Sequence, residues 1–235
     1  MEAGILLFLL FGLVVVGLFA LVIGLAIVGQ RRARERQQGM AGFAHHKEWE
    51  YRPADPSLVG RFHGAPFGRG HSMAATNVLL GRHDGRPFVA FDYRYTTTSG
   101  SGDDRSSSTH THSVVALNLG VQTPGLSVAP TGTFGRLVNA VTGRDIPIGD
   151  PAFDQAFTVT SHSPEFARDV LHPGILDVVR HHPHLAWRFE QDSMLVIRNG
   201  EHSPQEVEAK LHFMDAILDR IPPHVMDKLR GEQPR

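Results

Sequence analysis

The architecture of this chain follows from one run of residues, Asn77-Val-Leu-Leu-Gly-Arg-His-Asp-Gly-Arg-Pro-Phe-Val-Ala-Phe-Asp-Tyr-Arg-Tyr95. Asp84-Gly85 lies between two apolar segments and favours a tight turn between antiparallel strands, because such a turn needs positive φ angles at its centre. We interpret Asp92 and Arg94 as a polar cross-strand pair on the face of the second strand that lies opposite its aromatic residues. Alternate residues on its other face are apolar or aromatic, which predicts a β-hairpin with one buried side: Val89, Phe91, Tyr93 and Tyr95.

Further strands are predicted on the C-terminal side of this hairpin. The serine- and glycine-rich residues 98–109 are too polar to pack and predict a flexible, exposed loop. A second hairpin is expected over residues 185–198, with its turn at Gln191-Asp192. Strand patterns also cover residues 110–119, 124–130 and 153–160.

Capping signals predict the helices. Ser163-Pro164-Glu165 offers a side-chain cap, a proline at the first position and an acid in the first turn. Ser203-Pro204-Gln205-Glu206 is a capping box, and the helix after it should end at Pro222-Pro223. One or two helical turns are expected over residues 134–141. The last helix carries a single apolar stripe: Val207, Leu211, Met214, Leu218 and Ile221.

These patterns together indicate an α+β fold. We expect a mainly antiparallel sheet with two or three packed helices, including the C-terminal amphipathic helix, all following an N-terminal transmembrane helix. Residues 51–225 form this soluble α+β domain, and residues 226–235 are a tail.

The N-terminal residues predict a membrane anchor. Residues 4–28 carry no charged or strongly polar side chain. At about 1.5 Å per residue they form a helix of roughly 37 Å, enough to cross a hydrocarbon core of about 30 Å. A cleaved signal peptide is disfavoured, because no basic segment precedes the apolar run and no A-x-A-like site follows it. Residues 1–29 are therefore the predicted anchor, which contacts the lipid bilayer through residues 4–28.

The segment after the anchor indicates how the protein is oriented. Residues 30–50 are polar and charged and predict a juxtamembrane linker or a short helix. They include four arginines, whereas Glu2 is the one charged side chain before the apolar run. The positive-inside rule then predicts a single-pass protein of the cell membrane with its domain in the cytoplasm. The arginines are also candidates for contact with anionic headgroups at the membrane surface: Arg31, Arg32, Arg34 and Arg36.

Composition and motifs exclude several functional classes. The formal net charge is −1 and the sequence pI is about 7.0, so nothing favours a nucleic-acid partner. Cysteine is absent, which excludes disulfides, thiol nucleophiles and cysteine-ligated metals. No G-x-S-x-G, P-loop, G-x-G-x-x-G or H-E-x-x-H motif occurs. We therefore predict no catalytic residues and no cofactor.

Histidine is the residue type that leaves a metal site open. The chain has 15 histidines. His110 and His112 are two residues apart on a predicted strand, so both project from the same face and have the spacing of a chelating pair. His45-His46 and the histidines at 181, 182 and 184 form further groups. A third ligand at a definable position is missing from these patterns, and solvated polar residues remain the simpler interpretation.

Several stretches resemble a family of uncharacterised bacterial membrane proteins, a domain of unknown function that is common in actinobacteria. The resemblance implies a membrane-tethered α+β domain and brings no activity, cofactor or catalytic residue. The serine-rich loop and the histidines depart from the family pattern. The matching parts are Asn77-Val78-Leu79 with Gly81, residues 85–93, residues 149–154 with 157–159, Ala167 with Leu171, residues 187–197 and the closing helix.

Three functions are compatible with these features. The leading hypothesis is a membrane-anchored, non-catalytic interaction or scaffold domain with a protein partner at the membrane. The second is a metal-binding protein or metal-dependent hydrolase that uses His110 and His112. The third is a peripheral lipid-binding module that uses Arg31–Arg36 and one face of the sheet.

Overall fold

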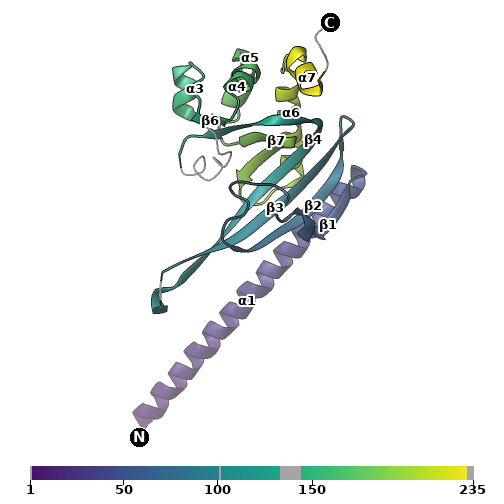
Figure 1. Ribbon diagram of the computed structural model, residues 1–235. Coiled ribbons are helices and arrows are strands. Elements are labelled where there is room, and N and C mark those ends of the chain that lie inside the picture. Colours follow the sequence, from purple (N-terminus) through teal and green to yellow (C-terminus); the bar gives the residue numbers. More distant parts are fainter. Residues whose placement is uncertain (1, 101, 133–143, 232–235) are drawn as a thin grey trace.

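The computed structural model confirms the α+β class and describes residues 2–100, 102–132 and 144–231. A long N-terminal helix leads to an antiparallel sheet, and the remaining helices gather on one side of that sheet (Figure 1). The strands are β1 (Glu50–Ala54), β2 (His71–His83), β3 (Arg86–Ser99), β4 (Ser106–Pro130), β5 (Arg144–Asp145), β6 (Phe157–Ser161) and β7 (Ala186–Asn199). The helices are α1 (Glu2–His46), α3 (Pro151–Ala156), α4 (Pro164–Val170), α5 (Pro173–Arg180), α6 (Pro204–Leu218) and α7 (Pro223–Arg230), with short 3₁₀ turns η1 (Pro56–Leu58) and η2 (Gly102–Asp104).

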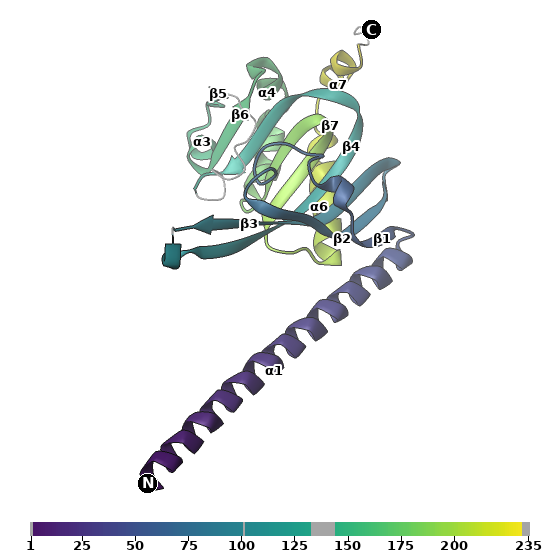
Figure 2. The same cartoon turned by 60° about the horizontal axis from the view of Figure 1, so that its bottom comes forward.

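The 25-residue strand β4 organises the sheet. The strand order is β1-β2-β3-β4-β6-β5, and β7 pairs with β4 along its other edge. The first half of β4 pairs with β3, its last residues pair with β6, and β7 follows it from His112 to Val128. The far end of the β3–β4 hairpin projects beyond the rest of the sheet (Figures 1 and 2).

Both faces of the sheet are covered, so there are two apolar cores. On one face the helices bury Ala90, Leu117 and Val196 among the residues of the larger core. On the other face the segment between β1 and β2 packs Phe62 and Phe67 against the aromatic residues of β3. Consequently β3 is buried on both sides, and Asp92 lies in the interior rather than on a solvent face.

The segment over the second face is held by a buried guanidinium group. Arg188 of β7 is fully buried and donates hydrogen bonds to the carbonyl oxygens of His63 (2.6 Å) and Ala65 (3.0 Å). It also forms an ion pair with Glu190 at 2.8 Å. These contacts satisfy backbone groups that the covering segment would otherwise bury without partners.

The predicted hairpin is present, with Asp84 (φ 48°) and Gly85 (φ 78°) in the left-handed region at its turn. The predicted flexible loop over residues 98–109 is wrong in its extent, because the ladder continues to the pair Ser99–Ser106. Cross-strand hydroxyl contacts such as Ser99–Ser106 (3.0 Å) accompany this polar end of the ladder. The polar composition of this segment therefore predicts its exposure correctly. It does not predict that the segment continues both strands of the hairpin.

Three further predictions are corrected. Residues 153–160 begin as helix α3 before strand β6, because Asp150 caps the helix by accepting from the Phe153 amide at 3.0 Å, with Pro151 at the first position. The Gln191-Asp192 turn is absent, since β7 runs straight through with a register shift opposite β4 and Gln191 at φ 55°. Residues 226–230 of the predicted tail belong to helix α7, which Pro223 starts.

Other predictions agree with the structure or lie outside it. Ser163 and Ser203 cap α4 and α6 as expected, accepting from the amides of Phe166 and Glu206. The segment expected as a linker or short helix continues α1 without interruption to His46. The helical turns predicted over 134–141 lie outside the described residues.

Gly81 marks a close approach that tests this packing. A Cβ atom at this position would lie 2.4 Å from Cδ1 of Trp49 and 2.8 Å from Cε1 of Phe88, whose rings pack edge to face with centroids 4.7 Å apart. We predict that Gly81→Ala lowers the free energy of unfolding by about 1–3 kcal/mol, because the aromatic pair must move. Urea unfolding followed by tryptophan fluorescence measures this.

The matched control for that substitution is Gly39→Ala. Nothing lies within 4 Å of a Cβ atom at Gly39, which is an exposed position of α1. Alanine should be neutral there or stabilise the protein by up to about 1 kcal/mol. Equal effects of the two substitutions would contradict the packing described for Gly81.

Candidate functional site

The candidate site lies where α1 meets the sheet domain. α1 is long and apolar enough to span a membrane, and its apolar side chains from Val16 to Val28 are exposed wherever they are described. Its C-terminal part behaves differently, because Met40 and Ala44 are fully buried in the larger core. One continuous helix therefore joins a membrane-type surface to the interior of the domain (Figure 2).

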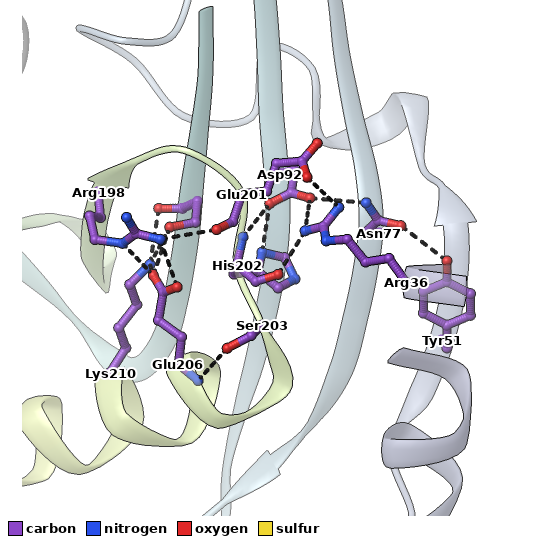
Figure 3. A network of polar contacts seen from close by, with 11 residues as sticks. Arg36, Tyr51, Asn77, Asp92, Arg198, Glu201, His202, Ser203, Glu206 and Lys210 are labelled. Atoms are coloured by element: carbon purple, nitrogen blue, oxygen red, sulfur yellow. Dashed lines mark hydrogen bonds and ion pairs between the residues drawn. The ribbon is translucent and has the colours of Figure 1, made fainter. Parts of the chain in front are cut away.

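An arginine of α1 reaches the buried carboxylate of β3 (Figure 3). The Arg36 guanidinium donates to Oδ2 of Asp92 and to the carbonyl oxygen of His202, both at 2.7 Å. It also forms an ion pair with Glu201 at 3.2 Å. The Arg36 side chain is 25% exposed, whereas that of Asp92 is fully buried. The contact is thus a partly buried ion pair between α1 and the centre of the sheet.

The other partners of Asp92 come from β2 and from the connection between β7 and α6. Asn77 donates from Nδ2 to Oδ2 of Asp92 at 2.9 Å, and its own Oδ1 accepts from Tyr51 at 3.2 Å. The backbone amide of His202 donates to Oδ1 at 2.9 Å, and the ring Nδ1 of His202 lies 2.9 Å from the same oxygen. Four segments that are distant in sequence therefore meet at one carboxylate.

A second polar group lies beside the first and is connected to it. Arg198 binds Glu206 through two hydrogen bonds of 2.6 and 2.7 Å and donates to the carbonyl oxygen of Glu201 at 3.0 Å. Lys210, almost completely buried in α6, lies 3.1 Å from Glu206 and donates to the hydroxyl of Ser113 at 2.5 Å. Through Glu201 this group continues into the contacts of Arg36 (Figure 3).

The charges in these groups are stabilised by their neighbours. Burial alone raises the pKa of Asp92, but the contacts with His202, Asn77 and Arg36 outweigh burial and lower this pKa to about 2. Burial also raises the pKa of Glu206, which Arg198 and Lys210 together lower to about 2. Burial lowers the pKa of Lys210 to about 8, because this lysine shares its one carboxylate with Arg198 and is the more deeply buried partner.

Two hollows adjoin the polar groups. One of about 510 Å³ lies between α1 and the domain and is lined by Arg32, Arg36 and Arg94, with Glu201 as the acidic residue of its lining. The other, of about 350 Å³, is lined by His182, His184, Arg198 and Lys210 among others. The first is the more strongly cationic of the two.

The arginines singled out in the sequence are divided by the structure. Arg31, Arg32 and Arg34 are exposed on α1, as a contact with headgroups requires. Arg36 instead points toward the domain and binds Asp92. The number of arginines after the apolar segment does not reveal this difference.

His110 and His112 do lie together on β4, beside the ring of Tyr95. The rings of His110 and His112 stack on Tyr95 with centroid distances of 4.9 and 5.8 Å. His112 is buried, and burial with the neighbouring His110 and Arg69 lowers its pKa to about 4. Within the described residues this pair does not belong to a group of three metal-ligand side chains. Metal binding by this pair stays a prediction.

Most of the polar residues in these groups carry no signal that local sequence patterns reveal. Asp92 was interpreted as half of a pair with Arg94, which is exposed and lines the cationic hollow. Lys210 lies outside the apolar stripe predicted for the last helix, yet it is buried. The sequence signal for this site is Asp92, an acid within a strand of mostly apolar and aromatic residues. It indicates a buried charge only once both faces of β3 are known to be covered.

Comparisons with known proteins give one informative likeness. No family model matches the chain, and no curated protein matches its sequence. The crystal structure of the mycobacterial trehalose monomycolate transport factor A, TtfA, is similar with a TM-score of 0.59 and 16% sequence identity. The match covers 81% of this chain and 98% of that chain. At this identity the likeness shows a shared fold, and its mycobacterial source agrees with the actinobacterial resemblance of the sequence.

The lowered carboxyl pKa values predict how stability depends on pH. Asp92 and Glu206 start from ordinary values of 3.8 and 4.5, and both fall to about 2 in the folded protein. Their contribution is therefore complete above about pH 4.5 and is lost as the pH falls toward 2. We predict that Asp92→Asn removes about 2 kcal/mol of this pH-dependent stability.

Urea unfolding of the detergent-solubilised chain between pH 2 and 7 measures that effect. Asp104→Asn, at the exposed turn of the β3–β4 hairpin, is the matched control and should keep the wild-type slope. An unchanged slope in Asp92→Asn would show that its carboxylate is not held by the partners described above.

Proposed function

We propose that this chain is a membrane-tethered, non-catalytic accessory protein whose domain lies in the cytoplasm and is presented to a membrane partner in a defined orientation. The observation that carries the proposal is the contact of Arg36 with Asp92 and His202. A flexible linker would let the domain tumble beside the bilayer. A continuous helix whose end is buried and ion-paired in the domain core favours a fixed orientation instead.

The chemistry of the polar groups supports an architectural role. The carboxylates of Asp92 and Glu206 are engaged by arginine, lysine, asparagine, a serine hydroxyl and a backbone amide at 2.6–3.2 Å. Their pKa values near 2 keep them ionised, which suits permanent ion pairs and not general acid–base catalysis near neutral pH. The network therefore suits the fixing of α1, the sheet and α6 against one another, and it lacks the features of a reaction centre.

The structural neighbour suggests a setting for this role. TtfA is by its name a transport factor for trehalose monomycolate. We extend to this chain the general part of that description, which is assistance in the transport of a lipid. The arginines that follow the apolar segment support cytoplasmic placement of the domain.

Deletion and complementation in the organism that encodes the chain test the proposal. We predict that deletion slows the appearance of the transported lipid on the outer side of the membrane, and that the full chain restores it. Arg36→Gln should fail to restore transport, because it removes the charge that binds Asp92. Arg34→Gln, an exposed position two residues earlier on the same helix, should restore it. Pulse-labelled lipids extracted from inner and outer layers supply the measurement.

A physical measurement separates orientation from expression level. The chain has no cysteine, so nitroxide labels can be placed at single introduced cysteines, for example Gln30→Cys on α1 and Arg168→Cys on α4. The label-to-label distance should be narrowly distributed in wild type and in Arg34→Gln, and broader in Arg36→Gln. Full complementation by residues 40–235 without the anchor, or turnover of a substrate by the purified chain, would overturn the proposal.

A second candidate function, recognition of an anionic lipid headgroup, is favoured by the cationic hollow. Its lining includes Gly29, directly after the predicted span, so it lies at headgroup depth if residues 4–28 cross the bilayer. Arg32, Arg36 and Arg94 line it against the single acid Glu201. Guanidinium groups bind phosphate oxygens well because their planar donors match the geometry of a phosphate.

We predict that a short-chain phosphatidylglycerol raises the melting temperature of the detergent-solubilised chain and that the matching phosphatidylcholine does not. The double variant Arg32→Gln/Arg94→Gln should lose this response. Arg105→Gln, exposed at the distant β3–β4 turn, is the control and should keep it. Inorganic phosphate distinguishes a free anion site from a lipid site, and equal responses to both lipids would exclude headgroup recognition.

A further inference from the structure

We propose that His83, His212 and Asp215 form a binding site for a divalent transition metal, with zinc as the best-fitting ion. The site is separate from the Asp92 network and from the His110/His112 pair. His83 is the last residue of β2, at the tip of the first hairpin. His212 and Asp215 are three residues apart on α6, so they lie on one face of that helix.

The geometry brings one donor atom from each residue to a common point. Nε2 of His83 lies 2.5 Å from Oδ2 of Asp215, and Nδ1 of His212 lies 3.8 Å from the same oxygen. All three donor atoms fall within 4.8 Å of one another. In a tetrahedral zinc site with bonds of about 2.0–2.1 Å, donor atoms are about 3.3 Å apart, so the observed separations bracket the required value.

The three side chains also have suitable freedom and chemistry. His83 and Asp215 are each 18% exposed and are held by the hairpin and the helix, whereas His212 is 74% exposed and can reorient without disturbing the core. Two imidazoles and one carboxylate leave further coordination positions for water, as in many three-ligand sites. The nearby Glu208 forms an ion pair with Lys47 at 2.5 Å, so water is the expected fourth ligand.

Metal binding at this place would have a structural consequence. The three ligands would join the tip of the β2–β3 hairpin to α6. The Lys47–Glu208 contact joins α6 to the residue that follows α1. The metal would therefore lie close to the place where the C-terminal end of α1 contacts the domain. A ring nitrogen binds a metal only through its unprotonated lone pair, so His83 and His212 would each contribute one such nitrogen.

The test uses the full chain in detergent without a histidine tag. Zinc binding is measured by elemental analysis after equilibrium dialysis against citrate and by competition with a chromogenic chelator. Cobalt(II) is substituted to record the visible absorption of a tetrahedral site. We expect one equivalent of metal per chain, a higher melting temperature with zinc, and binding weakened by about 10–100-fold or more in His212→Ala and Asp215→Asn. The exposure of His212 means that its variant should fold normally.

Two controls address the other histidine groups of the chain. His110→Ala and the double variant His181→Ala/His184→Ala should both retain the equivalent of zinc and the rise in melting temperature. The proposal is overturned if the chain takes up no stoichiometric zinc. It is also overturned if binding survives in His212→Ala and Asp215→Asn, or if binding is lost in one of the controls instead.

Discussion

The structure depends on how one buried charge is accommodated. Asp92 sits in a strand whose two faces are both covered, and its side chain has no contact with solvent. Burying a carboxylate costs several kcal/mol unless charges and hydrogen bonds compensate. The compensation comes from Arg36 of α1, Asn77 of β2 and His202 before α6, which are separated from Asp92 by 56, 15 and 110 residues. Those segments converge on the Asp92 carboxylate in the folded domain, so the buried charge favours the arrangement in which each of them docks there.

Similar polar contacts hold the connection between β7 and α6. Arg198 contacts the carbonyl oxygen of Glu201, and Arg36 contacts the carboxylate of Glu201 and the carbonyl oxygen of His202. The anchor helix, this connection and the first turns of α6 therefore share one polar network. Apolar packing alone tolerates small rotations of a helix, whereas a network of directional contacts with buried charges favours one arrangement over its neighbours. We regard this specificity as the reason for placing costly polar groups at the junction.

Local signals predicted the elements of the fold well where the signal is itself local. The Asp84-Gly85 turn and the serine caps of α4 and α6 are examples, because each depends on contacts within a few residues. Predictions failed where a distant partner decides the outcome. Gln191-Asp192 resembles a turn, but β7 remains extended there because β4 pairs with it on both sides of the irregularity.

The candidate site was harder to predict than the fold for the same physical reason. Periodicity placed Asp92 on the face of β3 opposite the aromatic residues, and this placement is correct. It left open whether that face is exposed, since the covering helices come from the far end of the chain. His83 belongs to the same class of failure, because its neighbours His212 and Asp215 are about 130 residues away and no spacing rule connects them.

The four arginines after the apolar segment carry the same charge but occupy different positions around the helix. For topology they are equivalent, because the positive-inside rule counts charges near the end of a span. For structure they differ, because a helix turns by about 100° per residue and only some positions face the domain. Arg36 faces it and binds Asp92, and Met40 and Ala44, one and two turns further along the same stripe, are buried. One face of a continuous helix thus belongs to the domain core, while Arg31, Arg32 and Arg34 are exposed on the same helix. A rotation of the helix that brought Arg36 toward the headgroups would leave Asp92 without its cation, so the orientation of the anchor and the stability of the sheet are parts of one constraint.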